Sequence, residues 1–209
     1  MKFTELGVLD DEVVLNGAIT HGGDLVMENG YPKASIGGKY SCEGNGWKYN
    51  HNDGTLYLND GTYDFSSTHP QGKTPGTPTT TPVACAIETQ SGVEITGGTF
   101  HETVTNSGTI KDGVFKGEVS NNQGGNITNG TFEQEVINND GGEISGGTFK
   151  GTVLNGNGII TGGAFAAGLS RNDGSVTGGV FNGNTALTDA RHVTVTGGSL
   201  LKVNGVVTT

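Results

Sequence analysis

Ile95-Thr-Gly-Gly-Thr-Phe100 is the phrase that decides the fold, because variants of it return six more times along the chain. Each copy has an aliphatic residue, a polar or glycine-rich stretch and then Phe, except the last copy, which ends in Leu200. The spacings between successive copies are 15, 17, 17, 16, 16 and 19 residues, and the leading aliphatic residues are Ile95, Ile110, Ile127, Ile144, Ile160, Val176 and Val195. A repeat of this length is typical of a solenoid.

Two further positions recur in most copies. An apolar residue lies four positions after Phe in Val104, Val119, Val136, Val153 and Leu169, and Asn follows two positions later in Asn106, Asn121, Asn138 and Asn155. No rung can bury its apolar residues alone, so rungs must stack at the strand spacing of about 4.8 Å. A rung of about 16 residues leaves no room for a helical crossover. The sequence therefore predicts an all-β fold, a single parallel β-solenoid (β-helix) with rungs of about 15–17 residues and an Asn ladder between them.

Three regions are expected along the chain. Residues 1–65 are interpreted as irregular N-terminal rungs and a cap, in which Leu58-Asn-Asp-Gly-Thr-Tyr63 and Ile36-Gly-Gly-Lys-Tyr40 are atypical copies of the phrase. Residues 66–86 are rich in Thr, Pro and Gly, which predicts an inserted loop or linker followed by a strand that re-enters the stack. Residues 87–209 form the regular β-solenoid.

Charge and hydropathy exclude several classes of function. The formal net charge is −10 and there is no basic cluster, which argues against nucleic acid and anionic membrane surfaces as partners. No apolar run approaches the roughly 18 residues of a membrane span. The two cysteines, Cys42 and Cys85, are compatible with a disulfide or with two buried thiols.

No pattern in the sequence predicts catalysis, a metal site or a cofactor. Glu118 and Glu135 occupy equivalent rung positions, but we expect them to point outward into solvent. The column after each Phe predicts a surface ladder of alternating charge, His101, Lys116, Glu133 and Lys150. A column of mostly Thr, from Thr96 to Thr196, suits a solvated strand face and also resembles the regular faces of ice-binding solenoids.

The segment from Gly46 to Asn59 resembles a phrase found in secreted and cell-wall parallel β-helix proteins of gut Firmicutes. Its Gly46-Trp-Lys-Tyr49 segment, polar turn and Gly54-Thr-Leu-Tyr-Leu58 strand match that phrase, and the downstream Thr-Gly-Gly-Thr-Phe copies are similar as well. The resemblance implies an extracellular or cell-surface setting and an adhesin-like or carbohydrate-binding role. Because no apolar stretch follows Met1–Glu5, we expect the signal peptide to be absent from this sequence.

Aromatic residues near the irregular end are the candidates for ligand binding. Trp47, Tyr49 and Tyr57 could stack on sugar rings, although packing within the cap is the favoured role of Trp47. The neighbourhood of the inserted loop, Ser66 to Pro82, is the other place where a glycan site is expected.

We therefore predict a non-catalytic extracellular surface module, adhesin-like, with glycans or a host or cell-surface molecule as partner. One alternative is a carbohydrate-active enzyme, a polysaccharide lyase or glycosidase, on a β-helix. Another is a structural spacer or self-assembling module joined end to end through its terminal rungs. The sequence does not determine the ligand, the handedness or the oligomeric state.

Overall fold

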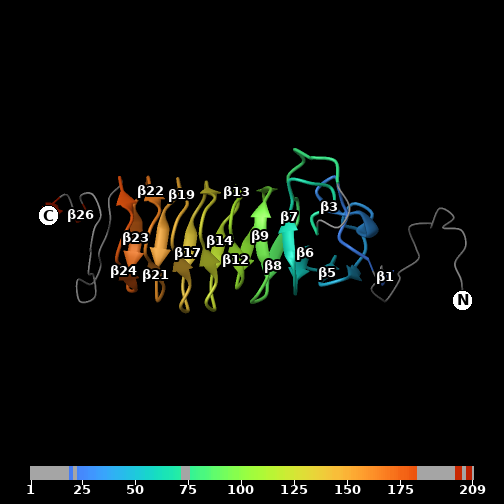
Figure 1. The fold of residues 1–209 in the computed structure, drawn as a ribbon, viewed down its shortest axis with the longest axis horizontal. Helices are drawn as coiled ribbons and strands as arrows, with labels where there is room; N and C mark the ends of the chain where they lie inside the picture. Colours follow the sequence, from blue (N-terminus) through green and yellow to red (C-terminus); the bar gives the residue numbers. More distant parts are fainter. Residues whose placement is uncertain (1–18, 21–22, 72–75, 183–200, 204–205, 209) are drawn as a thin grey trace, which may run out of the picture.

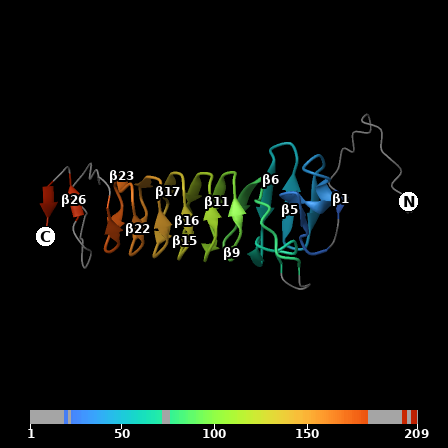
Figure 2. The same cartoon turned by 90° about the horizontal axis from the view of Figure 1, so that it is seen from above.

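The protein is a rod of stacked rungs, and its computed structural model describes residues 19–20, 23–71, 76–182, 201–203 and 206–208. Figure 1 shows the rungs succeeding one another along the long axis, and Figure 2 shows the same order from a perpendicular direction. The all-β parallel solenoid is thus confirmed, and one 3₁₀ turn, η1 (Lys33–Ser35), is the single helical element of the described residues. The seventh copy of the phrase, residues 195–200, lies outside them.

Each regular rung contributes short strands to three sheets, called here the Ile, Phe and Val sheets after the residues that recur in them. The Ile and Phe sheets are parallel throughout. The Ile sheet has seven strands, of which all but the first carry a leading aliphatic residue: β7 (Thr62–Asp64), β9 (Glu94–Gly97), β12 (Thr109–Ile110), β15 (Asn126–Ile127), β18 (Glu143–Ile144), β21 (Ile159–Ile160) and β24 (Ser175–Val176). The Phe sheet carries the aromatic residues in six strands, β10 (Thr99–Phe100), β13 (Val114–Phe115), β16 (Thr131–Phe132), β19 (Thr148–Phe149), β22 (Ala164–Phe165) and β25 (Val180–Phe181).

The Val sheet is the third and longest sheet. Its ten strands are, in spatial order, β1 (Ile19–Thr20), β4 (Cys42–Gly44), β5 (Trp47–Asn50), β6 (Thr55–Leu58), β8 (Ala86–Thr89), β11 (Val104–Asn106), β14 (Val119–Asn121), β17 (Val136–Asn138), β20 (Val153–Asn155) and β23 (Leu169–Asn172). All neighbours pair in parallel except β4, β5 and β6, which form an antiparallel meander. Two small antiparallel pairs complete the described strands, β2 (Met27–Glu28) with β3 (Tyr31–Pro32) and β26 (Leu201–Val203) with β27 (Val206–Thr208).

The interior contains a column of phenylalanines in face-to-face register. From Phe100 to Phe181 each ring lies nearly parallel to the next, at centroid separations of 4.8, 4.8, 4.7, 4.7 and 4.5 Å. These separations match the strand spacing, so the backbone pairing itself sets the ring stacking. The second glycine of the phrase makes room for the rings: at Gly147, with φ +107°, an added Cβ would lie 3.2 Å from Phe132 Cε2.

A ladder of buried amides runs along the rod where the Val-sheet strands end and the chain turns toward the Ile sheet, as the sequence predicts. Each Asn Nδ2 donates to the Oδ1 of the next Asn, with distances of 2.8 Å from Asn106 to Asn121, 2.8 Å to Asn138, 2.8 Å to Asn155 and 2.6 Å to Asn172. The Thr89 hydroxyl begins the ladder by donating to Asn106 Oδ1 at 2.9 Å. An amide can donate and accept along one axis, which satisfies both of its groups in a dry interior.

We expect Asn138→Ala to lower the free energy of unfolding by about 1–3 kcal/mol, because it leaves the buried Asn155 Oδ1 without its ladder donor. Urea unfolding followed by circular dichroism would measure the change. The matched control is Asn157→Ala in an exposed turn, where we expect a change within about 0.5 kcal/mol. Equal losses in the two variants would contradict a stabilising role for the ladder.

The N-terminal copies of the phrase were interpreted wrongly. Tyr63 does not replace Phe, because β7 places it beside Ile95 in the Ile sheet, while Phe65 packs edge to face on Phe100 at 5.4 Å. Ile36 does not face the interior either: it follows η1 with a φ of 50°, and its side chain is 56% exposed. The first error arises because Leu58 lies on β6 of the Val sheet, opposite Thr89, and the second because Ile36 ends a 3₁₀ turn in a left-handed conformation.

Cys42 and Cys85 are buried free thiols, which resolves the two alternatives left open by the sequence. Cys42 lies on β4 and Cys85 just before β8, both within the apolar interior of the N-terminal end. Burial raises the pKa of Cys42 to about 11 and that of Cys85 to about 12. The neutral thiol is therefore the stable form of both residues in the folded chain.

We expect neither thiol of the native protein to react readily with iodoacetamide at pH 8, and both to react in urea, as read by mass spectrometry. The folded pKa values lie above the ordinary 9.0, so the unfolded chain loses these protons first. The stability they confer is complete below pH 9 and is lost as the pH rises beyond it. A Cys42→Ala/Cys85→Ala variant should lose less stability between pH 8 and 10 than the wild type, and an equal loss would count against this linkage.

Candidate binding site

Two of the three predicted ligand-binding aromatics are core residues. Trp47 and Tyr49 lie on β5 and are each 2% exposed. Trp47 Nε1 donates to the Gly23 carbonyl at 3.1 Å, and the Tyr49 hydroxyl donates to the Gly38 carbonyl at 3.3 Å. Burial raises the pKa of Tyr49 to about 12. Both rings therefore fill the interior of this end of the rod, which is the packing role favoured for Trp47.

Tyr57 differs from them because its side chain is on the outer face of the Val sheet. Tyr57 is half-buried, and its neighbours on the adjacent strands are Lys48 of β5 and Glu88 of β8. Its hydroxyl donates to Asp53 Oδ2 at 3.0 Å, and this hydrogen bond raises the pKa of Tyr57. Tyr57 lines neither of the two hollows described below, so the structure does not bring the three aromatics together.

The inserted segment is a folded loop that leaves the stack where a Phe-sheet strand would otherwise lie. Phe65 N–H donates to the Gly97 carbonyl at 3.0 Å, and Val83 bridges to Phe100 in parallel, so both ends of the loop adjoin the Phe sheet. The loop closes on itself through Thr68 N–H to Thr77 O at 3.1 Å. It is also tied to the N-terminal hairpin by Met27 N–H to Thr68 O at 2.8 Å.

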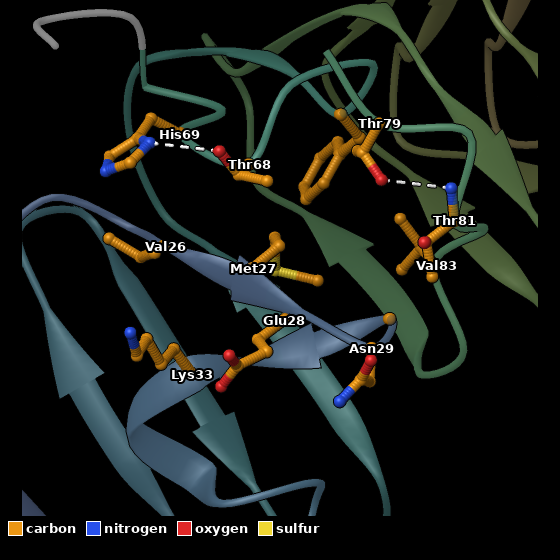
Figure 3. A pocket seen from close by; sticks show the side chains of 12 residues that line it. Val26, Met27, Glu28, Asn29, Lys33, Thr68, His69, Thr79, Thr81 and Val83 are labelled. Carbon is orange, nitrogen blue, oxygen red and sulfur yellow. Dashed lines mark hydrogen bonds between the residues drawn. The ribbon is translucent and has the colours of Figure 1, made fainter. Parts of the chain in front are cut away.

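A hollow of about 290 Å³ lies between this loop and the hairpin of β2 and β3. Its apolar lining includes Met27, Phe65 and Val83, whose side chains are buried. Figure 3 shows Met27 between two polar groups of residues, one on the hairpin side and one on the loop side. The polar residues are Glu28, Asn29 and Lys33 on the hairpin side and Thr68, His69, Thr79 and Thr81 on the loop side.

The turn between β2 and β3 brings the hairpin against the re-entering chain. Asn29 and Gly30 both have positive φ, 52° and 87°, as a tight two-residue hairpin requires. The Gly30 carbonyl accepts the Ala84 N–H at 2.9 Å, and a Cβ on Gly30 would lie 2.6 Å from the Pro82 carbonyl oxygen. The Asn-Gly dipeptide is a strong hairpin signal in the sequence, and it lies outside the repeat.

A second hollow of about 360 Å³ lies on the other side of the loop, against the start of the Phe sheet. Thr79 and Thr81 line both hollows, so the chain between them separates one from the other. The remaining lining consists of glycines, Val114 and small polar residues, namely Asp64, Ser66, Thr80, Thr96, Gly97, Gly98, Thr99, Asp112, Gly113 and Val114.

The outward carboxylates and hydroxyls of the rungs mostly have structural partners. Glu118 is exposed and Glu135 is half-buried, with Glu135 Oε1 accepting the Thr152 hydroxyl at 3.2 Å. The charge ladder is confirmed for Lys150 and Glu133, which pair at 3.2 Å. In the Thr column the hydroxyls donate to main-chain carbonyls of the preceding rung, at distances of 3.1 to 3.5 Å for Thr96, Thr128, Ser145, Thr161 and Thr177.

The described residues contain no group of three or more His, Cys, Asp or Glu side chains that could hold a metal ion. No helix in the described part of the chain has the length and apolar character needed to cross a membrane. No protein-family model matches the chain, and no curated protein or solved structure matches it either. Inference about function therefore rests on the two hollows and the surface beside them.

We expect Gly30→Ala to destabilise the protein by about 1–3 kcal/mol, because Ala is strained at this φ and its methyl group would meet the Pro82 carbonyl. Thermal unfolding would measure the loss. Gly54→Ala is the control: Gly54 also has positive φ, but an added Cβ there meets nothing within 4 Å. The Gly30 variant should lose more stability than the control, and the reverse order would show that the close approach to Pro82 is unimportant.

Proposed function

We propose that this chain is a non-catalytic module of an extracellular or cell-surface protein, and that the hollow between the loop and the β2–β3 hairpin binds a carbohydrate. The observation that carries the proposal is the composition of this hollow. Apolar side chains of Met27, Phe65 and Val83 form one part of it, and hydrogen-bonding side chains surround them. A sugar ring has the matching chemistry, since its C–H groups form an apolar face and its hydroxyls form a polar edge.

The size of the hollow suits a small glycan unit. Its volume of about 290 Å³ is near the lower end of the range of about 300–1,000 Å³ for small-molecule sites. Glu28 supplies acceptors, Lys33 supplies donors, and the Asn29 amide supplies both. These three side chains are exposed, so a ligand can reach them without rearrangement of the core.

The number of carboxylates that line the hollow supports a binding role over hydrolysis. Glycoside hydrolysis ordinarily uses two carboxyl groups roughly 5 to 9.5 Å apart. Among the described residues that line this hollow, Glu28 is the one carboxylate. A polysaccharide lyase or glycosidase remains the alternative that a product assay distinguishes.

The negative net charge of the chain favours uncharged or basic carbohydrates over acidic ones as ligands. With a formal charge of −10, the chain repels polyanions over the range set by the salt concentration. Neutral and amino-bearing glycans are therefore the favoured ligands, and acidic polysaccharides such as pectins are disfavoured.

A glycan array, followed by calorimetric titration with chitobiose and cellobiose, tests this proposal. We expect Glu28→Ala and Asn29→Gly to weaken binding by about tenfold each, since each removes a hydrogen-bonding side chain while Gly retains the positive φ of the turn. Lys48→Ala, on the exposed outer face of the Val sheet, is the control and should bind like the wild type.

Three outcomes would overturn the proposal. The first is unchanged binding in both variants, which would move the site elsewhere. The second is shortened oligosaccharide product in the titrated mixture, which would identify an enzyme. The third is absence of carbohydrate binding together with concentration-dependent growth in light scattering, which would favour the self-assembling spacer.

A further inference from the structure

We infer that the two hollows beside the loop are consecutive subsites for one linear glycan, which crosses the loop at Thr79–Thr81 and continues along the outer face of the Phe sheet. The inference rests on the proposed function and specifies its ligand as a polymer. Its first support is adjacency: Thr79 and Thr81 line both hollows, so the two hollows lie on opposite sides of one short segment, which a ligand must cross to occupy both.

The second hollow has the shape and chemistry of a shallow groove for sugar hydroxyls. Three glycines, Gly97, Gly98 and Gly113, contribute backbone to its lining. A Cβ on Gly98 would lie 2.5 Å from Phe65 Cβ, so the backbone there packs directly on the buried aromatic side chain. Asp64 and Asp112 add carboxylates. The Oδ1 atom of each accepts a main-chain N–H, from Ser66 and Gly113 respectively. Hydroxyl-donating sugars suit such acceptors, whereas acidic sugars do not.

The face beyond the second hollow offers no barrier to an extended ligand. Outward positions of the Phe sheet hold small uncharged residues in register, namely Thr99, Val114, Thr131, Thr148, Ala164 and Val180. The turns that precede the last four of these strands, residues 128–130, 145–147, 161–163 and 177–179, contain Thr, Ser, Asn and Gly alone. A neutral polymer on this strip would cover no charged side chain at these positions, so it would avoid the cost of desolvating charges there.

A polymer explains the arrangement better than two separate small ligands. Each hollow is small and open, and a single sugar in either one would bind weakly. Joining two weak sites through one ligand makes the second contact intramolecular, which raises the overall affinity by effective concentration. Affinity should therefore increase with the length of the oligosaccharide.

The test compares chitobiose with chitohexaose, and cellobiose with cellohexaose, by calorimetric titration of the whole chain. For the series that binds, we expect the wild type to bind the hexasaccharide at least about tenfold more tightly than the disaccharide. Thr99→Val/Asp112→Asn changes only the second hollow and should remove this gain while leaving disaccharide affinity within about twofold of the wild type. Thr105→Val/Glu118→Gln, on and beside the outer face of the Val sheet, is the matched control and should retain the gain.

The outcomes separate the two proposals. Equal affinity of the wild type for the two lengths overturns the inference but leaves a single carbohydrate site intact. An equal loss of disaccharide and hexasaccharide affinity in the second-hollow variant also overturns it. Failure of the wild type to bind either disaccharide or hexasaccharide overturns both proposals, and thermal unfolding of each variant confirms that a loss of binding is not a loss of folding.

Discussion

In-register parallel pairing is the constraint on which the rest of this structure depends. It places each residue directly over its equivalent in the next rung, so every interior position must hold a side chain that packs well against itself. Phe satisfies this by ring stacking at 4.5–4.8 Å, and Asn satisfies it by donating to one neighbour while accepting from the other. An ionised side chain would repel its own copy, and the described interior positions of the regular rungs hold apolar residues, Asn and Thr89.

In-register pairing is interrupted at the N-terminal end, and the two hollows of the candidate site lie there. The ring of Phe65 meets Phe100 at 77° where the stack would require a parallel ring, and Thr89 replaces Asn at the start of the amide ladder. The inserted loop occupies the position of a missing Phe-sheet strand. The two hollows of the candidate site therefore lie where the repeat is interrupted, whereas the hollow over the regular rungs, about 580 Å³ beside Ile137, Leu154 and Arg171, is an open one on the outer face of the Val sheet.

The sequence predicted the regular rungs well, because their contacts are between copies of the same residue at a fixed spacing. It missed Asn172 as the last member of the ladder, because a β-bulge between β20 and β23 shifts the register by one residue. It misassigned Leu58, whose strand neighbour Thr89 belongs to the amide column. In both cases a local change of register, invisible to a count of residues, decides the contact.

The candidate site was harder to predict, because it depends on contacts between distant segments. A site beside the loop was expected, but the β2–β3 hairpin forms its other wall. Hydrogen bonds to Thr68 and Ala84, which are far from the hairpin in the sequence, hold the hairpin there. Trp47 and Tyr49, which the sequence offered as ligand-binding aromatics, are buried in the antiparallel meander. A recurring pattern reveals the residues that stack, whereas a binding surface is made of residues that occur once.

The direction of the backbone hydrogen bonds has a mechanical consequence. In all three sheets they run along the rod, from one rung to the next, as do the amide bonds of the Asn ladder. A tensile load along the axis would therefore act on one rung interface at a time, and the end rung would peel away before its neighbours yield. Each detached rung would release 15 to 17 residues of extended chain, so the rod would lengthen stepwise under tension and dissipate the applied work gradually.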